Sequence, residues 1–233
     1  MDVTKNDDHQ EDIDLLLKGN LIPKRGIIHI GAHEGQEVAK YLALGFKKIM
    51  LIEANSELVE LLNDKFRNVS EVVVVFQAIS DIEGTIDFHI HTSRSGSTEP
   101  ASILKMKEFN KIVKTLSTPK TIQVPTCRLE SLFKDQYELE DYNFINVDVQ
   151  GAELHVFKGA SSILPHFDAI ISEVNLIELY EGAALEEEIV DYLEKHSFIK
   201  EKCIYHELYE GERHFKAWGE CLFLNKGKAN EMA

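Results

Sequence analysis

The chain has 233 residues, enough for one α/β domain with a sizeable core. Its formal net charge of -15 argues against a nucleic-acid partner, because such binding depends on Lys and Arg side chains that neutralise phosphates. The sequence contains neither an apolar stretch of about 18 residues nor a signal-peptide pattern, so we expect a cytoplasmic protein that does not bind a membrane.

Three cysteines, Cys127, Cys203 and Cys221, are widely spaced and include no CxxC pair. This spacing indicates neither a zinc knuckle nor a disulfide framework. We therefore expect buried, reduced thiols of the kind found in a cytosolic enzyme.

The N-terminal residues 1–20 are predicted as a polar extension with a short helix around Ile13 to Leu17. From Ile27 to Glu53 the pattern predicts a strand, a turn with Gly31 and Gly35, a helix and a second strand. Such a unit binds the adenosine part of a cofactor in doubly wound folds. Glu53 follows Gly31 by 22 positions, about where an acid that binds ribose is expected.

The middle of the chain predicts further strands. Val72 to Phe76 is an unbroken apolar run, typical of a strand covered on both faces. Strands are also expected at Thr85 to His91 and at Ile122 to Thr126. Residues 92–120 lack a regular pattern apart from one short helix expected around Leu104 to Leu116, and we interpret them as a lid-like insertion.

The last part of the chain alternates strands and helices. Strands are expected at Phe144 to Val149, Ala169 to Val174, Cys203 to Leu208 and Cys221 to Leu224, with an amphipathic helix over Glu186 to His196. This alternation predicts a doubly wound α/β fold with a largely parallel, Rossmann-like sheet. No internal repeat or low-complexity linker interrupts it, so we expect one domain over residues 1–233.

The glycine pattern bears on the cofactor. A nicotinamide site needs G-x-G-x-x-G around a pyrophosphate, whereas this turn reads Gly31-Ala32-His33-Glu34-Gly35, with Glu37 close by. Two carboxylates near the helix start would repel a pyrophosphate but suit a ligand with an ammonium and a sulfonium group. The charges therefore favour S-adenosylmethionine.

Several segments of the sequence, including this turn, resemble those of a known protein family. The segments HIGAHEGQE, LIEAN, QAISD and above all INVDVQGAELHVFKGA, followed by SEVN, resemble the FkbM-type family of S-adenosylmethionine-dependent methyltransferases. The resemblance runs from about Gly26 to Asn225 and implies a seven-stranded class I methyltransferase fold with an antiparallel last strand. It also implies O-methylation of a small molecule or a sugar. Where this sequence has His29 and His33, family members more often have Asp and Asn.

Candidate site residues follow strand ends, where ligands bind in open α/β sheets. Asp148 closes a strand and is expected either to bind the cofactor's ammonium group or to act as the base on the acceptor hydroxyl. His33 and His155 are the other candidate bases. The residues expected to contact the cofactor are Gly31, His33, Gly35, Glu37, Glu53, Ala54, Ala78, Ile79, Asp148, Gln150 and Glu153.

Asp148, Glu173 and Asn175 offer the oxygen ligands typical of a Mg²⁺ site, although no metal is expected. The working hypothesis is an S-adenosylmethionine-dependent O-methyltransferase that acts on a small-molecule or sugar acceptor. A nicotinamide-dependent oxidoreductase and a non-catalytic nucleotide-binding scaffold are the alternatives. The sequence predicts neither the acceptor nor the oligomeric state.

Overall fold

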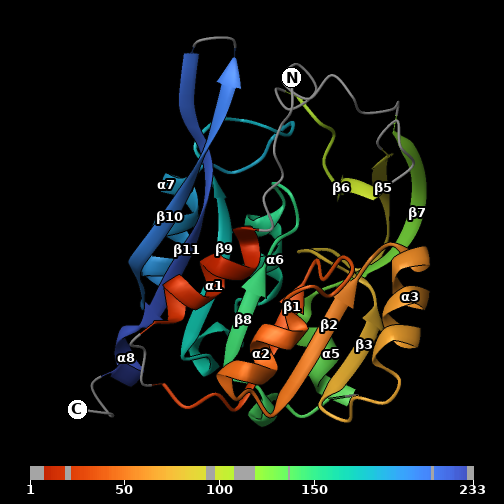
Figure 1. The fold of residues 1–233 in the computed structure, drawn as a ribbon, viewed down its shortest axis with the longest axis vertical. Coiled ribbons are helices and arrows are strands. Elements are labelled where there is room, and N and C mark those ends of the chain that lie inside the picture. The colour runs from red at the N-terminus through yellow and green to blue at the C-terminus, as the bar shows by residue number, and fades with distance from the viewer. Residues whose placement is uncertain are drawn as a thin grey trace.

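The computed structural model describes residues 8–18, 22–92, 98–107, 119–135, 137–210 and 213–229. Seven strands form the main sheet, in the spatial order β10-β11-β9-β8-β1-β2-β3 (Figure 1). β11 runs antiparallel to both of its neighbours, and the other neighbouring pairs are parallel. The predicted fold, a mostly parallel sheet with an antiparallel last strand, is confirmed. The strands are β1 Gly26–Ile30, β2 Lys48–Glu53, β3 Val72–Phe76, β8 Phe144–Val147, β9 Ala169–Asn175, β10 Phe198–Glu210 and β11 Arg213–Asn225.

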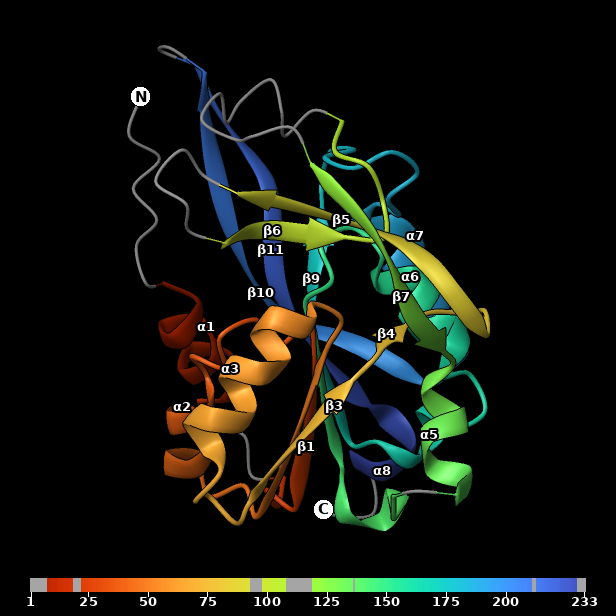
Figure 2. The same ribbon diagram turned by 90° about the vertical axis from the view of Figure 1, so that its right-hand side faces the viewer.

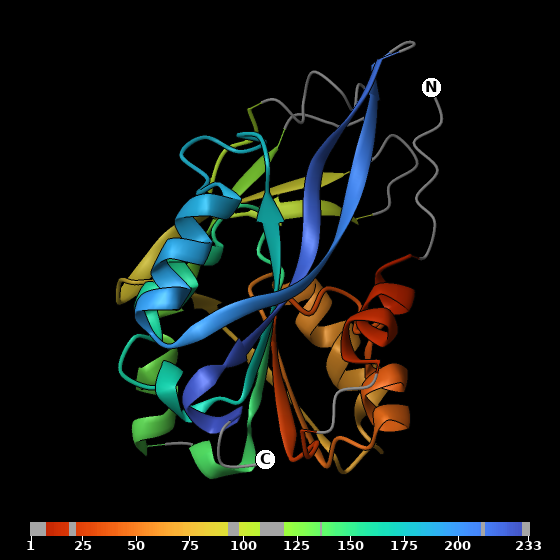
Figure 3. The same ribbon diagram turned by 90° about the vertical axis from the view of Figure 1, so that its left-hand side faces the viewer.

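Helices cover both faces of this sheet (Figures 2 and 3). One face carries α1 (Asp8–Leu17), α2 (Val38–Leu44) and α3 (Ser56–Phe66), and the other carries α5 (Leu129–Asp135), α6 (Glu153–Gly159) and α7 (Glu186–Lys195). Shorter helical segments are η1 (Leu139–Asp141), η2 (Leu164–His166) and α8 (Lys226–Ala229). Within the described ranges, we find no helix with the length and apolar character needed to cross a membrane.

Alternate residues of the central strands pack into two different cores. Ile28 and Ile30 of β1 lie with the helices of the α6 face, whereas Ile27 lies with those of the α2 face. Because both faces are buried, β1 needs apolar side chains on both sides, which explains Ile27, Ile28 and Ile30, and His29 is the one buried polar side chain among them. Gly45 ends α2 in a left-handed conformation, with φ of 93°. The side chain of Asn55 begins α3 by accepting a hydrogen bond from the backbone N–H of Glu57.

The strand at the sheet edge differs from the prediction. The first three residues of β3 are only half-buried, and Phe76 is 41% exposed. An unbroken β-branched run predicted a strand covered on both faces, and this expectation was wrong. Beyond β3 the main sheet has no further strand in the described part of the chain, so its side chains are less covered than those of β1.

A second sheet stands beyond the carboxyl ends of β1 to β3 (Figures 1 and 2). It has the order β4-β7-β5-β6, with β4 at Ala78–Ile79, β5 at Gly84–Thr92, β6 at Thr98–Ser102 and β7 at Lys120–Cys127. The strands expected at Thr85 to His91 and Ile122 to Thr126 therefore exist but do not join the main sheet. The predicted lid region contributes β6 and the start of β7 to this smaller sheet.

Residues 102–107 run from the second sheet to the loop after β9. Lys107 donates its backbone N–H to the carbonyl of Leu179 at 2.8 Å, and Glu181 donates to the carbonyl of Lys105 at 2.7 Å. The hydroxyl of Ser102 donates to the carbonyl of Val149 at 3.2 Å. The helix expected around Leu104 to Leu116 is absent from residues 104–107, and the rest of it lies outside the described residues.

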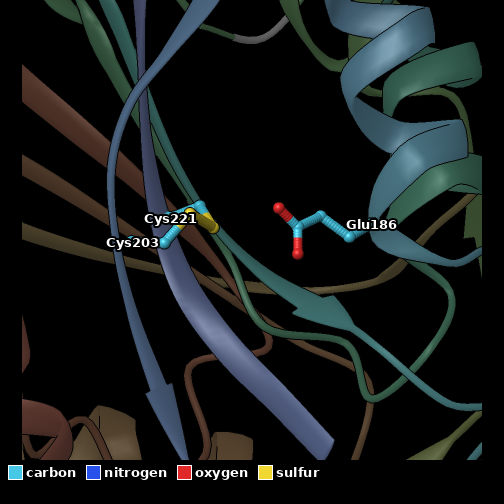
Figure 4. Close-up of side chains that lie close together, drawn as sticks. All are labelled: Glu186, Cys203 and Cys221. Atoms are coloured by element: carbon cyan, nitrogen blue, oxygen red, sulfur yellow. A yellow bond between two sulfur atoms is a disulfide. The ribbon is translucent and has the colours of Figure 1, made fainter. Parts of the chain in front are cut away.

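The structure corrects the expectation of reduced thiols. Cys203 and Cys221 face each other across β10 and β11, with their Cα atoms 4.1 Å apart, and form a disulfide. Figure 4 shows the carboxylate of Glu186 pointing toward this pair. Lys200 donates to that carboxylate at 2.5 Å, and the hydroxyl of Tyr205 donates to it at 2.9 Å. Because the two sulfurs are bonded to each other, they leave no thiolate for a metal ion.

Candidate active site

The turn after β1 brings two parts of the chain into contact. Gly31 has φ of 86°, and a Cβ atom added there would lie 1.8 Å from the backbone oxygen of Asp148. Gly35 has φ of 65°, and its Cβ would lie 2.7 Å from the ring of Phe66. Only glycine meets both demands, a left-handed backbone and a very close neighbour. Both predicted glycines therefore shape the turn: Gly31 lets it lie against the loop after β8, and Gly35 lets it lie against α3.

Glu53, at the carboxyl end of β2, is 6% exposed and organises this turn. Its Oε2 accepts a hydrogen bond from the backbone N–H of His33 at 2.9 Å, and its Oε1 accepts from those of Ala54 and Asn55 at 2.8 Å. Burial raises the pKa of this carboxyl, and the three backbone donors oppose the rise. An ionised carboxylate has about four acceptor sites, so at least one remains for a ligand hydroxyl.

The second sheet covers the apolar wall next to Glu53. Ala54 and Ala78 pack in one cluster with Phe88 and Ile90 of β5 and Val124 of β7. Ala78 and Ala54, two of the residues expected to contact the cofactor, thus lie together. Successive residues of a strand face opposite sides, so the neighbouring Ile79 lies instead in the core on the α6 face.

Asp148 follows β8 and is only half-buried. The side-chain amide of Gln150 donates to its Oδ1 at 2.6 Å and to Oε2 of Glu173 at 3.2 Å. The hydroxyl of Tyr180 in turn donates to Oε1 of Gln150 at 2.7 Å. Burial, together with the nearby Asp148 and other carboxylates, raises the pKa of Glu173 well above its usual range. Gln150 thus ties together two of the predicted acids.

A third acid, Glu220, was missed by the sequence reasoning. It lies on β11 directly opposite Glu173 on β9 and is 6% exposed. One carboxylate oxygen from each of Asp148, Glu173 and Glu220 lies within 4.8 Å of the other two, and we call these residues the acidic cluster. The sequence did contain a signal, because Glu220 directly precedes the apolar run Cys221 to Leu224. An acid in a buried strand is rare without a partner, so its position indicates a functional or paired carboxylate.

Glu153, at the start of α6, is fully buried beneath the loop that carries Asp148. Its Oε1 accepts from the backbone N–H groups of Val149 at 3.2 Å and Gly151 at 3.1 Å, while its Oε2 has no hydrogen-bond partner. Burial, and to a lesser extent the charge of Asp148, raises its pKa from 4.5 to about 7. These contacts hold the Asp148 loop in place.

Glu153 should make the stability of the protein depend on pH. Its pKa is higher in the folded chain than in the unfolded chain, so its contribution is fully present below about pH 4.5 and is lost as the pH rises through about 7. The rise from 4.5 to about 7 corresponds to about 3.4 kcal/mol, which is an upper bound on this contribution. We expect Glu153→Gln to lose less stability than wild type between pH 5 and pH 8, as measured by urea unfolding. Glu187→Gln, at an exposed position, is the control, and a pH dependence of Glu153→Gln equal to that of wild type would contradict this role.

The two candidate histidines occupy different surroundings. His33 lies in the glycine turn with φ of 48°, and its Nδ1 is 3.2 Å from the amide of Gln36. The Nδ1 of His155 lies 2.9 Å from Oδ1 of Asp81, and this pair stands near Tyr192 of α7. Within the described chain, His155 pairs with Asp81, and no hydrogen bond or ion pair joins it to Asp148.

Glu37 belongs to a buried polar network on the α2 face. Its Oε2 lies 3.8 Å from Nδ1 of His29. The same nitrogen lies 3.3 Å from the hydroxyl of Tyr41, which also accepts from the amide of Asn146 at 2.7 Å. The charges of Glu37, Glu220 and Asp148 contribute, after burial, to a strongly raised pKa of Tyr41. Tyr41 therefore senses the charges of both Glu37 and the acidic cluster.

The fold is that of the class I methyltransferases. Its marks are the order of the strands, the antiparallel β11 and a candidate site at the carboxyl ends of β1, β2 and β8. A family model described as the methyltransferase FkbM domain matches residues 29–200. The chain belongs to this FkbM methyltransferase family, as the resemblance predicted.

The chain is also similar to a named protein and to a solved structure. Over 189 residues the chain is 28% identical to the 2-O-methyltransferase NoeI of Sinorhizobium fredii (strain NBRC 101917 / NGR234), covering 79% of this chain and 76% of the relative. Among solved structures, the methyltransferase domain of bacterial CtHen1-C aligns with a TM-score of 0.50 and 10% identity, covering 93% of this chain and 96% of that chain. The structural likeness supports the fold alone.

Proposed function

We propose that this protein transfers the sulfonium methyl group of S-adenosylmethionine to a hydroxyl oxygen of a small molecule or sugar. Membership of a methyltransferase family supports the reaction type, and the 2-O-methyltransferase relative supports oxygen as the acceptor atom. The acceptor oxygen attacks the methyl carbon, the carbon–sulfur bond breaks, and S-adenosylhomocysteine leaves as a neutral thioether. The hydroxyl proton passes to a base.

The observation that carries this proposal is the site around Glu53. A buried carboxylate with a free acceptor site stands beside a wall of Ala54 and Ala78 and under Phe88 of the second sheet. A ribose hydroxyl can donate to the carboxylate while the adenine ring packs against the apolar wall. The methionine part would extend toward Gly31 and Asp148, which are in close backbone contact.

Asp148 is our candidate for the residue that meets the acceptor hydroxyl. It is half-exposed, so a ligand can reach it, and Gln150 fixes its position. The same carboxylate could instead bind the ammonium group of the cofactor. In either role the negative charges of the acidic cluster disfavour an anionic acceptor such as a phosphorylated sugar. A neutral polyol or a cationic amino sugar suits the site better.

Calorimetric titration with S-adenosylhomocysteine tests the cofactor. We expect binding by wild type and at least about tenfold weaker binding by Glu53→Gln, which corresponds to about 1.4 kcal/mol. The substitution removes charge but keeps the shape. Glu60→Gln, at an exposed position of α3, is the matched control and should bind like wild type.

The same titration separates the alternatives. Binding of NADH in place of S-adenosylhomocysteine would favour an oxidoreductase and overturn the proposal. A folded protein that binds neither ligand would contradict a methyltransferase role altogether. Binding of S-adenosylhomocysteine without turnover on any hydroxyl acceptor would favour a scaffold that has kept the fold.

A further inference from the structure

The acidic cluster concentrates negative charge at the carboxyl edge of the sheet. Asp148, Glu173 and Glu220 come from three neighbouring parts of the sheet, and one carboxylate oxygen of each lies within 4.8 Å of the other two. Glu173 and Glu220 are only 4% and 6% exposed. In the described chain, the side chain that donates hydrogen bonds to Asp148 and Glu173 is the neutral amide of Gln150. Close carboxylates in a buried setting repel one another unless a cation compensates them.

A second feature, independent of the carboxylates, is an unpartnered polar side chain on the same face of β9 as Glu173. Asn175 is 0% exposed, and neither its side-chain oxygen nor its side-chain nitrogen has a hydrogen-bond partner. Ala169 and Ile171 of β9 pack into the core on the α2 face, so Glu173 and Asn175 emerge on that same face by strand alternation. A buried amide without hydrogen-bond partners is destabilising, so this side chain is suited to binding something that the protein itself does not supply.

We propose that Asp148, Glu173 and Glu220, with the amide oxygen of Asn175, form a binding site for one hard divalent cation such as Mg²⁺ or Mn²⁺. Carboxylate and amide oxygens are the ligands that such cations prefer, and the partly open position of Asp148 leaves room for water or an acceptor oxygen. The sequence suggested Asp148, Glu173 and Asn175 only as weak metal candidates. Tertiary structure adds Glu220 from β11.

The role that we give this cation site in binding the acceptor rests on the proposed methyl transfer. A cation in the acidic cluster with open coordination positions would bind acceptor hydroxyl oxygens, and two adjacent hydroxyls of a polyol could chelate it. A hydroxyl bound to a divalent cation also loses its proton more readily, so a weaker base suffices. The acceptor class that follows is a neutral sugar or other vicinal diol.

Binding of Mn²⁺ to the full chain, after treatment with EDTA and in the absence of cofactor and acceptor, tests the site. Free Mn²⁺ is followed by electron paramagnetic resonance. We expect one equivalent per chain, displaced by Mg²⁺, and at least tenfold weaker binding in Glu220→Gln. Asp148→Asn, at a partly exposed position, should show the same loss of affinity for Mn²⁺. This variant is compared with wild type if Glu220→Gln does not fold. Glu60→Gln on α3 should bind Mn²⁺ like wild type.

Absence of stoichiometric Mn²⁺ binding by wild type would overturn the inference, as would equal binding by wild type and both cluster variants. Calorimetry with S-adenosylhomocysteine in EDTA separates this failure from a failure of the proposed function. A protein that binds S-adenosylhomocysteine but not Mn²⁺ keeps the methyltransferase proposal and loses the cation site. A protein that binds Mn²⁺ at the cluster but not S-adenosylhomocysteine keeps the site and loses the function.

Discussion

Replacing Gly31 with alanine should destabilise the protein by about 3 kcal/mol or more and abolish cofactor binding. A Cβ at this position would lie 1.8 Å from the backbone oxygen of Asp148, so the turn and the Asp148 loop cannot keep their present distance. The left-handed conformation, with φ of 86°, adds about 1–2 kcal/mol of strain for a residue with a side chain. Overpacking of a close contact typically adds about 1–3 kcal/mol. Urea unfolding measures the stability, and calorimetry with S-adenosylhomocysteine measures the binding.

The matched control is Gly45→Ala. Gly45 has a similar φ of 93°, but a Cβ there meets nothing within 4 Å. We expect this variant to lose only the strain, about 1–2 kcal/mol, and to bind S-adenosylhomocysteine like wild type. The difference between the two variants isolates the contact with Asp148. Equal losses of stability and unchanged binding in Gly31→Ala would show that this contact is unimportant.

Reduction of the Cys203–Cys221 disulfide should lower the free energy of unfolding by about 3 kcal/mol. The two residues are separated by 18 positions, and a cross-link that closes a loop of this size restricts the unfolded chain by about that amount. Urea unfolding with and without a phosphine reductant measures the change on the wild-type protein itself. As long as β10 and β11 stay paired after the disulfide is reduced, reduction should change only the stability of the protein.

Thiol counting in denaturant gives the second readout. With the disulfide formed, one free thiol per chain is expected, that of Cys127. This thiol is half-buried, and burial together with Glu83 raises its pKa to about 11. Cys127→Ser is the control and should keep the full response to reductant. Three free thiols in protein handled without reductant would contradict the disulfide and restore the expectation of reduced cysteines.

The first structural unit could be predicted from the sequence because its signals are local. The buried run of β1, the glycine turn and the apolar stripe of α2 follow one another within Ile27 to Glu53. Strand period, helix period and glycine conformations are properties of neighbouring residues. The position of Glu53 beside the turn follows from the same short segment, and its backbone hydrogen bonds agree with it.

The middle of the chain was harder to predict. Thr85 to His91 reads as a strand, but strand propensity does not say which sheet the strand joins, and the structure places it in the smaller sheet. Val72 to Phe76 reads as a fully covered strand, although its place at an edge is decided by the order of the other strands. Propensity describes a segment, whereas coverage depends on its neighbours in space.

The sequence by itself determined the fold class, the glycine turn, Glu53 at the end of β2 and Asp148 at the end of β8. These features rest on local pattern and on the rule that ligands bind at the carboxyl edge of such sheets. Only the tertiary structure decided that Cys203 meets Cys221, that Ile79 packs away from Ala78, and that Glu220 lies opposite Glu173 on the neighbouring strand. Glu173 and Glu220 are 47 positions apart, and the register between β9 and β11 comes from packing of the whole sheet. The acidic cluster is therefore a property of the assembled fold.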